Sequence, residues 1–260
     1  MFKKLLILLL FFTFLISGCG KKEEPVIDDL QAIHERGRLL VGVRADTKPF
    51  GYYDINGQLI GFDVDLAKKI AGKILDDESK IEFVVLNADE RIAALNSKKV
   101  DMLVATMSIT QQRLRVVDFS ESYYVAGQGV LVSAKSPFSS LNELDDKRLI
   151  VVYGTTAEKS LRDVYPTANI LAFKTYSEAY ASLKRGEADA IVADDVVLLG
   201  YALGDKSVKL LSKRYSREPY GIAFRQGEES LSLQSVVNEL INAMRSTGAM
   251  QRLLESHNIL

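Results

Sequence analysis

Short apolar runs alternate with amphipathic stretches along most of the chain, which predicts alternating strands and helices. Continuous apolar runs at Leu39–Val43 and Val100–Val104 are typical of buried strands. Between them, Gly61-Phe-Asp-Val-Asp65 starts a predicted helix with two carboxylates in its first turn. Its apolar face comprises Val64, Ala67, Ile70, Ala71 and Ile74. This alternation predicts an α/β protein.

The same reading assigns the remaining segments. We predict a hairpin within residues 51–60, where Asn56-Gly57 supplies the turn. Further strands are expected at residues 80–86, 129–133, 170–173 and 221–224. Further helices are expected at residues 27–36, 89–97, 155–162, 178–185, 195–203, 229–246 and 249–256, with Ser177 capping the fourth and Ser139-Ser-Leu-Asn-Glu143 starting another.

An internal repeat indicates two similar lobes. Residues 92–106 align without a gap with residues 180–194, so that Thr106 meets Asp194, and residues 38–44 align with residues 148–154. Each lobe should therefore contain a mainly parallel sheet flanked by helices. The expected boundaries are residues 30–126 plus 221–260 for lobe 1, residues 129–217 for lobe 2, and hinges near 125–129 and 217–221.

Polar side chains follow the predicted strands at the points where ligands collect in such sheets. Thr106 and Ser108 follow one strand and are succeeded by Arg113, whose guanidinium can clamp a carboxylate with two parallel bonds. Arg44, Thr156 and Asp194 follow three other strands. A cleft with cationic and hydroxyl groups on one wall and a carboxylate on the other suits a zwitterion.

The N-terminus has the pattern of a lipoprotein signal. Lys3-Lys4 precede the apolar segment Leu5–Ile16, which is too short to cross a bilayer comfortably. Small residues before Cys19 resemble a lipobox, so residues 1–18 are a predicted signal peptide and Cys19 a predicted lipidation site. Residues 19–29 would then tether the chain to a membrane. Cys19 is the only cysteine, so an intrachain disulfide is impossible.

Charge and composition narrow the function further. The formal net charge is −1, which gives no sign of a nucleic-acid surface. The two histidines, His34 and His257, lie near opposite ends, and the sequence contains no recognisable phosphate loop or nucleophile–base pair. We therefore expect no metal, no cofactor and no catalytic residues, and a monomeric chain.

Three motifs carry a resemblance to a known family. Gly61-Phe-Asp-Val-Asp65, Ser108-Ile-Thr-x-x-Arg113 and Asp118-Phe-Ser-x-x-Tyr-Tyr124 resemble those of family 3 extracellular solute-binding proteins, the polar amino-acid receptors of ABC importers. The similarity covers nearly all of Leu30–Leu260, although Ser122 stands where the family usually has Pro. It implies a two-lobe periplasmic-binding-protein fold (type II), a location in the periplasm or at the cell surface, and a membrane permease as partner.

The resemblance also implies roles for individual residues. Arg113 matches the residue that clamps the ligand's α-carboxylate, and Asp194 matches the acid that receives the α-ammonium group. The remaining partners of the carboxylate are matched by Thr106, Ser108 and Thr156.

Ligand specificity should depend on the residues that depart from the usual pattern. Arg44 stands where many members have Asp, and Ala88 stands where many have an aromatic ring. Arg91 matches an arginine of the aspartate/glutamate receptors. Two extra cations predict a second ligand carboxylate, hence aspartate or glutamate. Weaker candidates for lining the cleft are Lys48, Tyr52 and Tyr220.

Three alternatives remain open from the sequence. The same receptor could bind glutamine, asparagine or another polar amino acid. The fold also houses dehydratases that act on prephenate-like acids, so an enzyme is a second alternative. A surface adhesin that retains the fold is a third.

Overall fold

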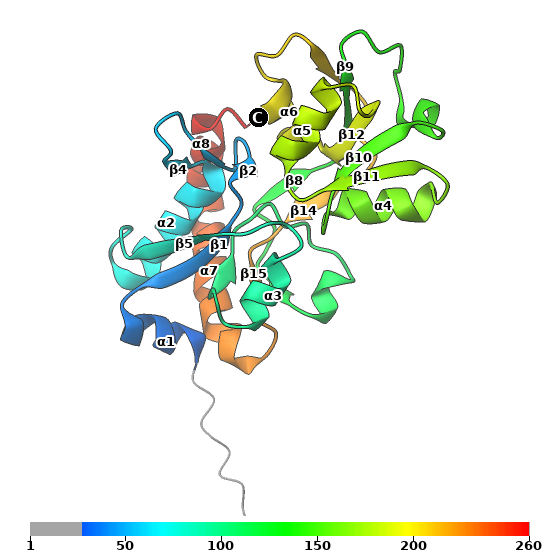
Figure 1. Ribbon diagram of the computed structural model, residues 1–260. Helices are drawn as coiled ribbons and strands as arrows, with labels where there is room; N and C mark the ends of the chain where they lie inside the picture. Colours follow the sequence, from blue (N-terminus) through cyan, green and yellow to red (C-terminus); the bar gives the residue numbers. More distant parts are fainter. Residues whose placement is uncertain (1–27, 260) are drawn as a thin grey trace, which may run out of the picture.

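The computed structural model describes residues 28–259 and shows two α/β lobes joined by two chain crossings (Figure 1). The predicted signal peptide, Cys19 and most of the predicted tether lie outside the described residues. None of the helices within residues 28–259 is both long and apolar enough to span a membrane.

Lobe 1 is built on a five-stranded sheet with the order β5-β1-β6-β15-β7. Its strands are β1 (Leu39–Val43), β5 (Ile81–Val85), β6 (Met102–Leu103), β7 (Asp118–Phe119) and β15 (Ala223–Phe224). A small sheet beside it contains β2 (Asp46–Thr47), β3 (Gly51–Tyr53) and β4 (Leu59–Ile60). The lobe's helices are α1 (Asp29–Arg36), α2 (Phe62–Leu75), α3 (Arg91–Asn96), the short η1 (Arg113–Arg115) and η3 (Glu228–Ser230), α7 (Leu231–Ser246) and α8 (Ala249–Ser256).

Lobe 2 repeats this plan with the order β11-β10-β12-β9-β13. Its strands are β9 (Gln128–Ser133), β10 (Arg148–Val152), β11 (Asn169–Phe173), β12 (Ala190–Asp194) and β13 (Val208–Leu210). Its helices are η2 (Leu141–Leu144), α4 (Thr156–Val164), α5 (Tyr176–Lys184) and α6 (Asp195–Ala202). Because β1 and β6 occupy the same places as β10 and β12, the topology confirms the repeat and the two similar lobes.

Both sheets are mainly parallel, as expected, and each contains one antiparallel strand that the sequence did not predict. In lobe 1, β1 is parallel to β5 and β6, whereas β15 is antiparallel to β6 and β7. Lobe 2 shows the same division, with β9 antiparallel to β12 and β13. The antiparallel strands β9 and β15 enter their sheets directly from a chain crossing. A parallel strand needs a crossover connection, usually a helix, and these two strands are not preceded by one.

The segments that connect the lobes lie side by side. The first, β8 (Tyr124–Ala126), pairs in antiparallel fashion with the second, β14 (Glu218–Tyr220). Figure 1 shows both strands running between the lobes. Two paired connections allow the lobes to rotate about one axis while their strand ends remain facing each other.

The core of lobe 1 lies between its sheet and its helices. Val41 in β1, Ile70 in α2 and Val237 in α7 are fully buried in one cluster. The apolar face predicted for α2 is therefore the face that packs inward. Burial of this kind is the main favourable term in folding.

Two local predictions are wrong. Helix α5 is capped by Thr175 rather than Ser177, because the Thr175 hydroxyl accepts the Glu178 N–H and the Glu178 carboxylate accepts the Thr175 N–H. The expected helix after Ser139 forms only the 3₁₀ turn η2.

Candidate ligand site between the lobes

A small cavity lies between the lobes at the ends of their strands. About 280 Å³ of space not filled by protein atoms, part of it open to solvent, lies at this site, and the residues that line it are Arg44, Ala88, Arg91, Thr106, Ser108, Arg113, Thr155, Thr156, Tyr176 and Asp194. All seven of the stronger sequence candidates are among them. A wider groove adjoins the cavity at Arg113, Thr155 and Thr156, which line both.

The loop after β6 is shaped by an aspartate of the Gly-Phe-Asp-Val-Asp motif. Thr106 has φ 46°, a left-handed conformation that is unusual for a β-branched residue. Its N–H donates to Asp63 Oδ2 at 2.9 Å, which fixes the loop. Burial raises the pKa of Asp63 to about 7, against the lowering effects of Tyr123, the Thr106 N–H and Arg91.

Arg113 lies at the start of η1 and contacts both lobes. Its Nη1 donates to the Ser108 carbonyl oxygen at 2.8 Å, and its Nη2 donates to the Gly154 carbonyl oxygen of lobe 2 at 3.0 Å. Burial lowers its pKa from the ordinary value, but an arginine remains charged at neutral pH. The side chain is therefore a fixed cation at the boundary between the lobes.

Asp194 ends β12 and contributes the carboxylate of lobe 2. It accepts a hydrogen bond of 2.6 Å from the Tyr220 hydroxyl. Burial raises the pKa of Asp194 to about 7; the Tyr220 hydrogen bond and Arg113 oppose this increase, and Glu218 adds to it. A cation in the cavity would stabilise the ionised form.

Two threonines place the start of α4 at the cavity. The Thr155 hydroxyl accepts the Glu158 N–H at 3.3 Å and donates to the Val152 carbonyl oxygen at 2.7 Å. Thr156 is the first residue of the helix. Free N–H groups and the positive end of the helix dipole favour a negative group here.

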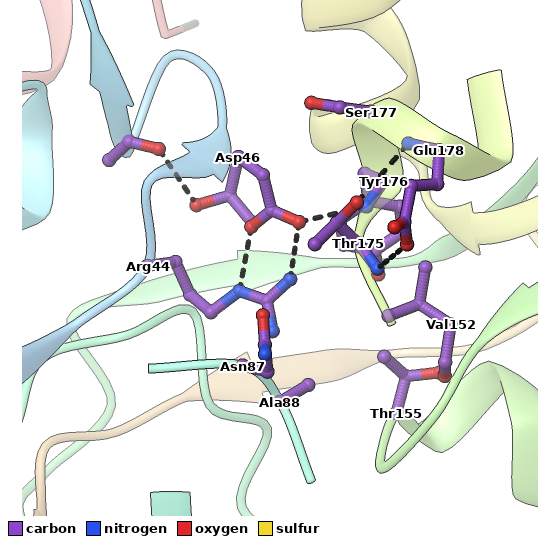
Figure 2. A network of polar contacts seen from close by, with 12 residues as sticks. Arg44, Asp46, Asn87, Ala88, Val152, Thr155, Thr175, Tyr176, Ser177 and Glu178 are labelled. Carbon is purple, nitrogen blue, oxygen red and sulfur yellow. Dashed lines mark hydrogen bonds and ion pairs between the residues drawn. The ribbon is translucent and has the colours of Figure 1, made fainter. Parts of the chain in front are cut away.

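Arg44 is buried, with 1% of its surface exposed, and forms an ion pair within lobe 1 (Figure 2). Its Nε and Nη2 donate to the two oxygens of Asp46 at 2.8 and 2.6 Å. Its Nη1 is buried without a hydrogen-bond partner among the described residues. The guanidinium also lies 5.7 Å from the ring centre of Tyr176. The charge of Arg44 is thus already balanced by Asp46, which the sequence argument for a second ligand carboxylate did not consider.

Arg91 is also buried, and it donates to the loops that flank the cavity. Its Nε donates to the Ala88 carbonyl oxygen at 3.1 Å and its Nη1 to the Ala105 carbonyl oxygen at 2.6 Å. Burial lowers its pKa to about 9, and the charges of Arg113 and Arg44 contribute. Arg91 therefore supports the walls of the cavity as well as lining it.

The three weaker candidates do not line the cavity. The Lys48 ammonium lies over the ring of Tyr52 at 5.4 Å, and Tyr220 is fully buried behind Asp194.

Sequence reasoning missed Tyr176 and the partner of Arg44. The signals were present: Asp46 is two residues after Arg44, and Tyr176 follows the true N-cap of α5. Within residues 28–259 no group of three or more metal-ligating side chains occurs.

Comparisons with known proteins agree with this architecture. The sequence model of the bacterial extracellular solute-binding proteins, family 3, matches residues 39–258. The ABC transporter glutamine-binding protein GlnH of Bacillus subtilis is 37% identical over 248 residues, which cover 92% of this chain and 90% of that protein. A glutamine-binding protein of Geobacillus stearothermophilus is 40% identical over 195 residues, 74% of each chain. The crystal structure of a cysteine-binding protein from Campylobacter jejuni superposes with a TM-score of 0.86 at 29% identity, covering 89% of this chain and 93% of that one.

Proposed function

The chain belongs to the bacterial extracellular solute-binding proteins of family 3, with the type II two-lobe fold, and from this premise we propose that it is the glutamine receptor of an ABC importer. The sequence alone favoured aspartate or glutamate, and the comparisons do not support that preference. Both relatives described above are named for glutamine. Others at lower identity are named for cystine and glutamate, so the choice of ligand must be argued from the cavity itself.

The balance of buried charge around the cavity carries the proposal. Three arginines line the cavity, and each has an aspartate whose negative charge lies nearby. Arg44 forms a direct ion pair with Asp46. Arg91 and Arg113 form no ion pair among the described residues, and they act on Asp63 and Asp194 only as nearby charges. A zwitterion with a neutral side chain adds no net charge to this set. A glutamate would add one buried negative charge that Arg44, already balanced by Asp46, is not free to balance, which is costly.

Arg44 also offers a suitable donor. Two of its nitrogens are occupied by Asp46, and Nη1 has no partner among the described residues, so it is available to a ligand in the cavity that Arg44 lines. An amide oxygen accepts such a bond without requiring a second full charge. The site therefore favours a side-chain amide over a side-chain carboxylate.

The α-groups of the ligand would be bound by the residues shared between the lobes. In this proposal, Arg113, Thr106 and Ser108 hold the α-carboxylate from lobe 1, and Thr156 at the start of α4 holds it from lobe 2. Asp194 receives the α-ammonium group. Because the ligand contacts both lobes, its binding favours the closed arrangement and excludes water. A membrane permease would then receive the ligand from the closed, monomeric receptor, which is anchored through lipid on Cys19.

The test is calorimetric titration of the purified protein with glutamine, glutamate, asparagine, aspartate and arginine. We expect glutamine to bind at least about tenfold more tightly than glutamate, since each 1.4 kcal/mol of unbalanced charge changes affinity tenfold. Tighter binding of glutamate would refute the charge argument but retain the receptor. Binding of none of these ligands by protein unfolded and refolded to remove any retained ligand would refute the receptor function.

A variant isolates the contribution of Asp46. Asp46→Asn keeps the shape and releases the positive charge of Arg44, so the ratio of glutamate affinity to glutamine affinity should rise. Asp46→Asn could also change lobe closure, but that change would alter the affinities for both ligands equally. The ratio of the two affinities therefore reports only the change in charge preference. An unchanged ratio would show that Asp46 does not set the charge preference.

A further inference from the structure

Several contacts join the two lobes outside the proposed ligand-binding groups. They do not involve Arg113, which is proposed to clamp the ligand's carboxylate. They gather around Asp46, which lies in β2 of lobe 1 and has only 12% of its side chain exposed. Figure 2 shows Asp46 between Arg44 and the start of α5 in lobe 2.

Asp46 is bound by lobe 2 through two separate groups. Its Oδ2 accepts the Tyr176 N–H, at the first residue of α5, at 2.8 Å. Its backbone carbonyl oxygen accepts the Tyr201 hydroxyl, from α6, at 3.0 Å. Arg44 holds the same carboxylate from lobe 1, so the acceptor is oriented before the lobes meet.

The two backbones also approach each other closely beside these bonds. A Cβ built at Gly200, in the middle of α6, would lie 2.0 Å from the Lys48 carbonyl oxygen. Gly200 has ordinary helical geometry, since it is not among the glycines with positive φ. Its lack of a side chain is therefore required by the contact with lobe 1 and not by the helix, in which alanine would be more favourable.

We propose that Asp46, Gly200 and Tyr201 form an interlobe latch, a set of contacts that holds the closed state and sets the rate of ligand release. The proposal rests on the proposed function only in that the lobes close around an amino acid. The latch itself makes no contact with the ligand's α-groups. Arg44 acts on release through Asp46, as a positioning residue, in addition to lining the cavity.

The sharpest test is Gly200→Ala, because the added methyl group overlaps lobe 1 only when the lobes are closed. We expect glutamine to dissociate at least about tenfold faster from this variant in stopped-flow measurements, with little change in the association rate. Small-angle scattering with saturating glutamine should show the contraction of the wild type and its loss in Gly200→Ala. Tyr201→Phe removes the interlobe hydrogen bond to the Asp46 carbonyl oxygen, together with a hydrogen bond to Ser177 within lobe 2, and should weaken binding about 2- to 10-fold.

Gly72→Ala is the matched control. Gly72 also lies inside a helix, α2, and a Cβ there would meet the flexible Glu78 side chain at 2.9 Å and the Glu78 backbone nitrogen at an ordinary 3.8 Å, all within lobe 1. It should release glutamine and contract like the wild type.

The outcomes separate the latch from the proposed ligand. If Gly200→Ala contracts with glutamine and releases it at the wild-type rate, the latch is wrong. If the wild type does not bind glutamine, the proposed ligand is wrong, and the same scattering comparison with whichever amino acid does bind decides the latch. Contraction of the wild type that is lost in Gly200→Ala would support the latch, and equal contraction of both would overturn it.

Discussion

Acidification should weaken ligand binding, because Asp194 must lose a proton to receive the ligand's ammonium group. Burial between the lobes raises the pKa of this carboxyl to about 7 when the cavity holds no ligand. In the proposed complex, the ammonium group binds the ionised form and keeps it ionised. Binding therefore releases a proton, and affinity falls as the pH falls below the ligand-free pKa.

The magnitude follows from the fraction of Asp194 that is ionised before binding. With a pKa of about 7, this fraction is about one-half at pH 7 and about one-hundredth at pH 5. The dissociation constant for glutamine should therefore rise about 50-fold between these values. Calorimetry at pH 7 in two buffers with different ionisation enthalpies should detect the release of about half a proton per ligand bound.

Asp63 provides the control, since burial raises its pKa to about 7 as well, but it contacts the Thr106 N–H. Asp63→Asn should retain the acid-dependent loss of affinity, whereas Asp194→Asn should bind weakly and without this dependence. A wild-type dissociation constant that stays constant from pH 7 to pH 5 would refute the role of Asp194. The same slope in Asp194→Asn would refute it equally.

Two further substitutions separate binding from folding. Arg113→Ala should raise the glutamine dissociation constant by more than about 100-fold, about 3 kcal/mol, because it leaves the buried ligand carboxylate without its main cation; wild-type affinity in a titration would remove Arg113 from the site. Arg225→Ala should lower the free energy of unfolding by about 3–5 kcal/mol, because Arg225 is the buried ion-pair partner of Asp29 and donates to the Val100 carbonyl oxygen at 2.9 Å. Its effect should be visible in the urea midpoint, and an equally large loss of glutamine affinity would contradict a purely structural role.

Much of the fold was predictable because its determinants are local or repeated. The strands β1 and β10 are apolar runs, and the repeat places β6 and β12 beside them. Residues at the carboxyl ends of these strands lie where the two sheets face each other, which is why Thr106 and Asp194 could be placed at the cavity without the structure. The antiparallel strands were not foreseen, because the direction of β15 depends on where the returning chain crosses between the lobes.

The charge balance of the cavity could not be read from the linear sequence. Arg44 was interpreted as a free cation, although Asp46 lies two residues away, since spacing alone does not show whether two side chains in a loop meet. The structure shows that they do, with both carboxylate oxygens engaged. Asp63 was likewise assigned only to the first turn of a helix, whereas it binds the loop that carries Thr106.

The Gly-Phe-Asp-Val-Asp motif supports the site without specifying the ligand. Asp63 holds the Thr106 loop, and Asp65 contacts His257, which follows α8, at 3.0 Å. The two carboxylates of the motif therefore join segments within lobe 1. A motif with these contacts identifies the scaffold of the family, because any ligand with an α-carboxylate would require the same loop. In the proposed function, the preference among amino acids depends instead on which of the cavity's arginines already has an acidic partner. Arg44 has one, and for that reason counting Arg44 and Arg91 as two free cations is a weak guide to the ligand of this chain.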